Sequence, residues 1–298
     1  MTIKPIETYT LDKQEFLNSV LNKIGKQEFS NTKYKNPLKR IIGGFIENAT
    51  DIEEIYVERS QDIGYDPEGT GVLDREKPVV SVQYHRETIE HGYKATIQYK
   101  QMRKGFLNKN SLGTMADTII QQLHTGKEVD EYTDCINTLK SLVERTTTLN
   151  NVISVKPVVD ETTAKAFIKA IKKTIPKMSE YTTNFSEKAN SATPSDLILF
   201  LDSDTEVEME VEWLASAFNM DVTKLNETTK IVIPNMKAKM GAIGVLCHHK
   251  CIKINPCYYD IDSIKNSRGK FINYDLVTET LLSHTTWYPY AIIKDNLK

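Results

Sequence analysis

The sequence has 298 residues, of which 40% are hydrophobic and 26% charged, and its acidic and basic residues nearly cancel to a net charge of −2. This composition is typical of one or two globular domains and excludes an intrinsically disordered chain. The near-neutral charge excludes binding to nucleic acid through an overall basic surplus, so any contact with DNA is expected to be weak and non-specific.

The first ten residues lack the apolar core of a signal peptide, and no apolar run is long enough to span a membrane. We therefore expect a product of the cytoplasm without a membrane segment. Its four cysteines are too few for a disulfide framework in a chain of this length and are expected to be reduced thiols.

The first third of the chain predicts an arm followed by strands. Residues 1–50 are polar and rich in lysine and asparagine, and they read as an arm rather than a core. Alternating apolar residues predict strands around Ile55, at residues 80–84 and at residues 91–99. The turn-rich stretch 64–71 separates the first two strands. Such a hairpin buries little by itself, so we expect it to lie against a neighbouring subunit.

Helical periodicity follows. Apolar spacing predicts one long helix over residues 111–143, with a kink near Gly126. A strand is expected at residues 151–159, near a sheet edge because it contains Pro157. Asp160 occupies an N-cap position before an amphipathic helix that Pro176 should end.

The second half predicts an α/β arrangement. Residues 197–201 form a continuous apolar run, typical of a buried strand, and a helix is expected to begin directly after it. The buried face of that helix would comprise Val207, Val211, Leu214, Ala215 and Phe218. Strands at residues 230–233, 244–247 and 250–254, a turn at residues 266–269 and a closing segment at residues 271–293 complete the chain.

Two clusters could carry chemistry. The strand ending in Asp202 and Asp204 resembles the metal and sugar-nucleotide site of glycosyltransferases, although helix capping explains the same residues more simply. Cys247, His249 and Cys251 have zinc-like spacing and would share one face of a strand, with His248 on the other face. Small buried thiols are the simpler interpretation, so no metal site is predicted.

No nucleotide-binding or nucleophile motif is present. The sequence contains neither a Walker A loop nor G-x-G-x-x-G nor the G-x-S-x-G nucleophile elbow. We therefore predict no catalytic residue, no cofactor and no enzymatic activity.

The order of these blocks resembles the major capsid proteins of tailed bacteriophages with the Hong Kong 97 type of fold, especially those of short-tailed phages of Gram-positive bacteria. Three stretches carry the resemblance: residues 36–39 with 52–56 and 64–66, residues 196–220, and residues 266–269 with the aromatic-rich stretch after them. The second contains Leu197, Phe200, Asp202, Trp213 and Phe218. The third contains Asn266, Arg268 and Gly269.

The resemblance implies an α+β fold in four parts. These are an N-terminal arm (1–50), an extended β-hairpin loop (51–105), a peripheral domain with a spine helix (106–159 and 256–298) and an axial domain (160–255). Inter-subunit contacts through the extended loop would involve Tyr65, Asp66, Tyr84 and Tyr93. Some relatives carry an additional immunoglobulin-like domain, which this sequence is expected to lack.

The implied function is that of a virion shell subunit. Pentamers and hexamers of the chain would assemble in the host cytoplasm, with scaffolding and portal proteins, into an icosahedral or prolate head around double-stranded DNA. The alternatives are an encapsulin-like shell that encloses cargo proteins and, less simply, a metal-dependent glycosyltransferase that uses Asp202 and Asp204.

Overall fold

The computed structural model describes residues 33–47, 51–71, 73, 75–98, 109–145, 149–210 and 228–295. Predictions for other residues, including Trp213, Phe218 and most of the arm, lie outside the described residues. The chain divides into two compact units. Unit 1 consists of residues 1–36, 90–131 and 259–278, and unit 2 of residues 37–89, 132–258 and 279–298.

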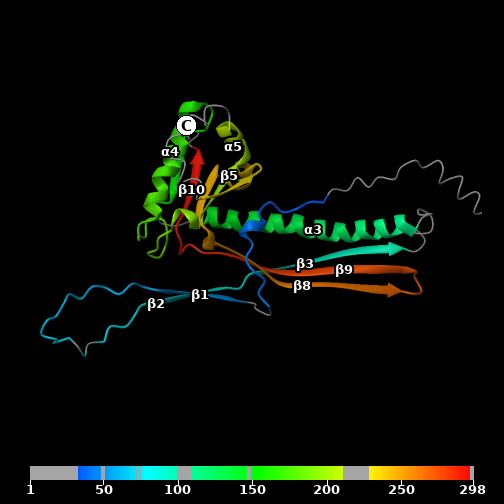
Figure 1. The fold of residues 1–298 in the computed structure, drawn as a ribbon, viewed down its shortest axis with the longest axis horizontal. Coiled ribbons are helices and arrows are strands. Elements are labelled where there is room, and N and C mark those ends of the chain that lie inside the picture. Colours follow the sequence, from blue (N-terminus) through cyan, green and yellow to red (C-terminus); the bar gives the residue numbers. More distant parts are fainter. Residues whose placement is uncertain are drawn as a thin grey trace, which may run out of the picture. The chain divides into compact units, whose positions relative to one another are not determined.

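A five-stranded sheet with the order β4-β10-β7-β5-β6 organises unit 2 (Figure 1). The strand β5 lies inside this sheet, parallel to β6 and antiparallel to β7, and all its residues are buried, as the apolar run predicts. The strand β4 lies at an edge, parallel to β10, which fits the expectation from Pro157. The strands are β4 (Val152–Val155), β5 (Leu197–Asp202), β6 (Thr229–Ile233), β7 (Gly244–His248) and β10 (Tyr290–Asp295).

Alternate residues of β5 supply the two cores of unit 2, because successive side chains in a strand point to opposite faces. Leu197, Leu199 and Leu201 pack with Phe167 and Ile171 of helix α4 (Glu161–Met178). The core on the opposite face includes Ile198 and Phe200 of β5, Leu139 and Leu142 from the end of helix α3 (Lys109–Glu144), and Met236 and Met240 of the short helix α8 (Met236–Met240). Both faces of the sheet are therefore covered.

Helix α4 begins as predicted and ends slightly later. The Asp160 side chain accepts a hydrogen bond from the Thr163 backbone N–H (2.8 Å), and the Thr163 hydroxyl accepts one from the Asp160 N–H (3.1 Å), which closes a capping box. The prediction that Pro176 stops the helix was wrong by two residues, since the helix runs to Met178. A proline removes one backbone hydrogen bond, and near the end of a helix only one short turn has to continue past it.

Unit 1 contains the first two thirds of α3 and most of a three-stranded sheet with the order β3-β9-β8. Helix α3 is continuous through Gly126, and a Cβ at that position would lie 3.1 Å from the Tyr93 ring. This close approach, rather than a hinge, gives a packing reason for glycine there. The strands are β3 (Thr88–Gln98), β8 (Ile252–Asn266) and β9 (Phe271–His284).

A separate two-stranded hairpin consists of β1 (Ile52–Val57) and β2 (Val80–His85), which pair antiparallel from Ile52 opposite His85 to Val57 opposite Val80. Figure 1 shows the long loop that joins them. The two-stranded hairpin ends at His85, and β3 pairs with β9 in another sheet, so the extended loop over residues 51–105 stays a prediction. A strand that alternates in polarity fits either sheet, so its pattern could not decide the partner.

Other boundaries also differ from the prediction. Part of the expected arm is packed: Leu38 is fully buried, and the Gly43 N–H donates to the Ile254 carbonyl of β8 (2.7 Å). The strands β4 and β10, which were expected in the peripheral domain, pair in one sheet with β7, β5 and β6. Val207 of helix α5 (Ser203–Glu210) is exposed, whereas Thr205 and Met209 are buried. Within the described residues, no helix is long and apolar enough to cross a membrane.

Removal of the α4 cap tests whether this helix depends on its capping box. Asp160→Ala should lower the free energy of unfolding by about 1 kcal/mol, because it leaves the Thr163 N–H without its acceptor. Urea denaturation followed by circular dichroism measures the change. Thr162→Ala is the control, since Thr162 is exposed in the same turn. Equal stability of the Asp160→Ala variant and the wild type would contradict the capping role.

Candidate inter-subunit surface

The end of the hairpin that contains Glu54 and His85, called its root, is held by a buried ionic network. Glu54 of β1 and His85 of β2 are 8% and 2% exposed, and the His85 Nε2 lies 2.9 Å from the Glu54 Oε2. The Lys253 ammonium of β8 lies 3.2 Å from the other Glu54 oxygen. The His85 Nδ1 lies 2.7 Å from the Ser283 hydroxyl of β9. Because an ionised carboxylate only accepts, the His85 Nε2–H donates to Glu54.

The charge on Glu54 is stabilised by its partners. Burial by itself raises the pKa of Glu54, but the hydrogen bond from His85 and the positive charge of Lys253 outweigh that effect and hold the pKa below its ordinary value of 4.5. The carboxylate is therefore ionised at neutral pH, and the root of the hairpin is tied ionically to the strands beneath it.

A second set of contacts holds Tyr56 of β1 and Ser81 of β2 against the same subunit. The Tyr56 hydroxyl donates to the Ala189 carbonyl (2.9 Å) and lies 3.2 Å from the Tyr181 hydroxyl. The Tyr56 ring packs edge-on against Trp287, with ring centroids 6.2 Å apart. Burial and the hydrogen bond with Tyr181 raise the pKa of Tyr56 to about 12. The Lys188 ammonium donates to the Ser81 hydroxyl of β2 (2.8 Å). The root is thus attached to its own subunit along both strands.

The far part of the hairpin has no such cover. Three large apolar side chains of the loop between β1 and β2 are almost fully exposed: Ile63 (84%), Tyr65 (93%) and Leu73 (91%). The loop is nevertheless locally ordered around Asp66. Hydrogen bonds from the Thr70 hydroxyl and from the backbone N–H groups of Gly71 and Glu68 lower the pKa of Asp66 to about 2. An ordered loop that presents apolar side chains to solvent is typical of an interaction surface.

The four residues predicted for the extended loop do not all lie there. Tyr65 and Asp66 are in the loop, and Tyr84 is in β2, where its hydroxyl donates across the hairpin to Glu53 (3.0 Å). This hydrogen bond raises the pKa of Tyr84. Tyr93 is in β3 and packs against α3 at Gly126, so the structure does not place it in the hairpin. Whether Tyr65, Asp66 and Tyr84 contact a neighbouring subunit stays a prediction.

The predicted site residues of β5 are Leu197, Phe200 and Asp202, and they take part in packing and in hydrogen bonding. Leu197 and Phe200 are fully buried on opposite faces of β5. The Asp202 Oδ1 accepts from the Lys237 backbone N–H in the first turn of α8 (3.1 Å), although Asn235 occupies the N-cap position of that helix. Asp202 therefore binds a backbone N–H of α8, whereas the prediction had it cap the helix that directly follows β5. An open pocket of about 540 Å³ is lined by Asp202, Asp204, Glu208 and Lys237 together with several apolar residues.

The closing turn is built as the sequence predicts. The Asn266 side-chain oxygen accepts from the Gly269 N–H (2.7 Å), so the turn between β8 and β9 is closed by an asparagine. A Cβ on Gly269 would clash with the Phe271 ring, so any larger residue at this position requires that ring to move. Arg268 is exposed beside them. These residues shape a turn of unit 1.

The cysteine and histidine cluster is arranged differently from the prediction. Strand β7 ends at His248 and a 3₁₀ turn (His249–Cys251) follows, so strand alternation does not continue. Cys247 and Cys251 are fully buried, as expected for small thiols, while His249 is exposed. Burial raises the pKa of the Cys251 thiol, which opposes the thiolate form that zinc binding needs.

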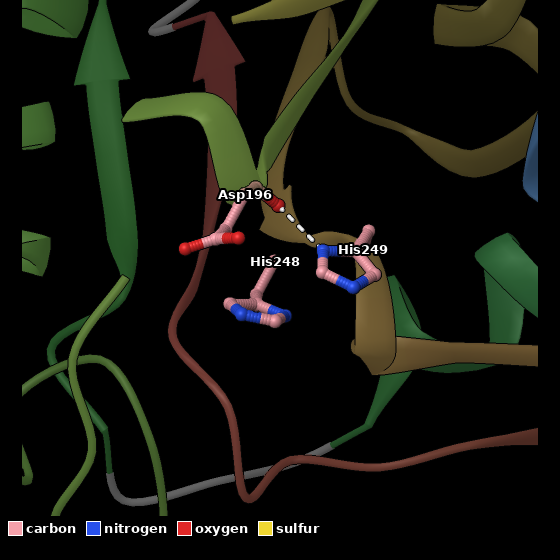
Figure 2. A group of neighbouring side chains, drawn as sticks. All are labelled: Asp196, His248 and His249. Atoms are coloured by element: carbon pink, nitrogen blue, oxygen red, sulfur yellow. Dashed lines mark hydrogen bonds between the residues drawn. The ribbon is translucent and has the colours of Figure 1, made fainter. Parts of the chain in front are cut away.

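Asp196, His248 and His249 instead come together, with possible ligand atoms within 4.8 Å of one another (Figure 2). The two imidazole rings are stacked, with centroids 4.4 Å apart and planes inclined by 24°. Nitrogen lone pairs lie in the ring planes, so nearly parallel stacked rings cannot both direct them at one ion. The His248 Nδ1 also accepts from the Lys250 N–H (3.1 Å). Burial and the nearby charges of His249 and Lys250 lower the pKa of His248 to about 4. The cluster is an aromatic stack rather than a preformed metal centre.

Comparison with solved structures identifies the fold. The capsid structure of Staphylococcus phage Andhra contains a chain that matches with a TM-score of 0.73 at 10% identity, covering 91% of this chain and 87% of that one. A chain of the mature capsid of bacteriophage PhiM1 matches with a TM-score of 0.61 at 10% identity, covering 92% and 91%. The fold is therefore the α+β Hong Kong 97 type of phage capsid proteins, as predicted.

Sequence comparison identifies the family. The profile of the Phi29-like phage major capsid protein family matches residues 2–294, and the chain belongs to this family. The major capsid protein of Bacillus phage GA-1 is 27% identical over 279 residues, which cover 90% of this chain and 58% of the relative. That of Bacillus phage PZA is 28% identical over 272 residues, covering 87% and 59%. The match thus spans less than three fifths of each relative.

The sequence analysis missed the root network. Glu54 was noted only as part of a strand, and His85 and Lys253 were given no role. In the hairpin register Glu54 pairs with Gln83 and His85 pairs with Ile52, so Glu54 and His85 are diagonal neighbours on one face, but the sequence does not specify that register. A charged residue at an inward position of an alternating strand was the available signal.

Loss of Lys253 tests the root network directly. Lys253→Met should lower the free energy of unfolding by about 3 kcal/mol, because it leaves the buried Glu54 carboxylate without its cation. Lys230→Met is the matched control: the Lys230 ion pair with Glu206 is more exposed and should contribute less than about 1 kcal/mol. Guanidinium denaturation of both variants measures the difference, and equal losses would contradict a special role for the root.

The pH dependence of the root follows from the lowered pKa of Glu54. A carboxyl group whose folded-state pKa is depressed stabilises the fold above its unfolded-state pKa, and this contribution is lost as the pH falls through the folded-state pKa. Glu54→Gln should therefore destabilise the protein at neutral pH, and the difference from wild type should shrink as the pH falls below the ordinary value of 4.5. Stability curves over this pH range provide the measurement. A difference that does not change with pH would show that Glu54 acts through its shape and not its charge.

Proposed function

We propose that this chain is a shell subunit of a phage head, in which many copies assemble around double-stranded DNA, and that it has no catalytic role. Membership of the Phi29-like major capsid protein family supports this function. The single structural observation that carries it is the hairpin, whose root is fixed to the subunit while its loop exposes large apolar side chains. The protein would accordingly reside in the virion capsid after assembly in the host cytoplasm.

The hairpin supplies the assembly contact. Fully covering a large apolar side chain contributes about 1.5–3 kcal/mol, so three exposed side chains on one loop offer a substantial gain when a neighbour covers them. The buried root fixes the end from which the loop extends, so less of this gain is lost to ordering the hairpin on contact. Tyr65 and Asp66 would lie in this contact, with Tyr84 nearer the root.

The contact is head-to-tail, because the loop of one subunit meets a different surface of the next. Such heterologous contacts close into rings when the rotation between subunits allows it. Pentamers and hexamers built in this way would form the icosahedral or prolate shell, with the axial sheet around β5 facing the ring centres. Scaffolding and portal proteins would assist its assembly.

Substitution of the loop side chains tests the proposal. Ile63→Ser, Tyr65→Ser and Leu73→Ser together should abolish shell formation and leave the melting temperature unchanged, since all three are exposed in the subunit. Sedimentation and electron microscopy, under conditions in which the wild type assembles, report the particles.

The matched control is the triple variant Val152→Ser, Val159→Ser and Val207→Ser, which removes exposed apolar side chains elsewhere in unit 2. It should form normal shells. Normal shells from the loop variant would remove the hairpin from the assembly contact. A wild-type chain that stays monomeric at high concentration would overturn the proposed function itself.

A further inference from the structure

The exposed face of α4 carries a ladder of lysines. Lys165, Lys169, Lys173 and Lys177 follow one another at intervals of four residues, and all four are exposed. A fifth lysine, Lys172, is half-buried beside them. The opposite face of the same helix holds the buried side chains Phe167, Ile171, Ile175 and Met178. The lysines therefore form one continuous stripe that points away from the core of unit 2.

This stripe has a single sign of charge. Apart from Glu161 in its first turn, helix α4 contains no aspartate or glutamate, and Lys169 and Lys173 each have a lysine four residues before and four residues after them. Like charges four residues apart destabilise a helix, whereas opposite charges at that spacing stabilise it. Helix α3 follows the stabilising pattern, with ion pairs between Lys127 and Glu131 and between Lys140 and Glu144. The repulsion along α4 is not needed for folding, which indicates a role outside the subunit.

The stripe also stands out from the charge of the whole chain. Five lysines bring +5 to a chain with a net charge of −2, so the rest of the chain carries −7. The chain as a whole therefore gives no net attraction for a polyanion, so attraction at this face depends on its local charge. At a rise of about 1.5 Å per residue, the four exposed lysines are spaced about 6 Å apart along about 18 Å of helix.

Such a row suits one kind of ligand. Lysine ammonium groups are point charges on flexible stems, which pair with phosphate oxygens without reading base sequence. A regular row of them matches a regular row of phosphates, and each contact releases counterions. We infer that the exposed lysine stripe of α4 binds the phosphate backbone of double-stranded DNA. This inference deepens the proposed function, in which the shell encloses DNA, by naming the contacting face.

The test is DNA binding by the purified chain. The variant Lys169→Gln, Lys173→Gln and Lys177→Gln is titrated against a short fluorescein-labelled DNA duplex, with anisotropy measured over a series of salt concentrations. The slope of log affinity against log salt should become shallower by about three, roughly one for each lysine. Affinity at low salt should fall by roughly tenfold or more. The melting temperature should stay equal or rise, because repulsive pairs are removed.

The control variant loses the same charge elsewhere. Lys39, Lys156 and Lys294 are exposed on three other segments, and their joint replacement by glutamine should leave the salt slope unchanged. If both triple variants lose the same affinity for DNA, the loss comes from the change in net charge and not from the stripe, and the inference is overturned. Unchanged binding by the α4 variant would overturn it as well.

One further outcome distinguishes a different occupant. The loop of the hairpin carries Asp62, Asp66 and Glu68 and no basic residue between residues 60 and 71. The acidic loop of another copy of the chain is therefore a second candidate ligand for the lysine stripe. If the α4 variant keeps its affinity for DNA and no longer forms shells, the stripe binds another copy of the chain and the DNA inference fails. Shell formation by the wild type is scored separately, so failure of the proposed function is recognised on its own.

Discussion

A hairpin of two strands has only one layer, and this constraint determines how the remaining parts of the protein are used. Neither face of β1 and β2 can be buried by the hairpin itself, so cover must come from elsewhere. At the root the cover comes from the same subunit, through Glu54, His85 and Lys253. In the loop no described residue of the subunit covers Ile63 or Tyr65. In the proposed shell, folding covers the root of the hairpin and a neighbouring subunit covers the loop.

The choice of an ionic root, rather than an apolar one, has a physical consequence. A buried ion pair adds little net stability compared with well-packed apolar residues, but it is costly to break by removing one partner. It therefore favours one arrangement of β1 and β2 over shifted registers, in which Glu54 would be buried without His85. We interpret the root as a device for specificity, which sets the register and hence the direction from which the loop extends.

Much of the fold followed from local sequence patterns. The continuous apolar run 197–201 predicted β5, and Asp160 with Thr163 marked the start of α4, because burial on both faces and capping leave local signals. The local patterns did not predict which strands pair in the same sheet. The strands β4 and β10 joined the axial sheet, and β3 left the hairpin, because pairing depends on residues far apart in sequence. The root network depends on the same long-range pairing and was therefore not predictable, and the turn after His248 changed which side chains meet.

The two exposed surfaces discussed above, the hairpin loop and the lysine stripe of α4, carry charges of opposite sign. A chain with a net charge near zero gains little from long-range attraction or repulsion as a whole, which permits dense association of copies. Here the neutrality results from separated regions, with an acidic hairpin loop and a basic stripe on α4. Separated charges of opposite sign orient approaching molecules and make the contacts sensitive to salt. A shell subunit with this pattern can associate through its apolar loop while its basic face stays available to a polyanion, so assembly and DNA contact need not compete for the same residues.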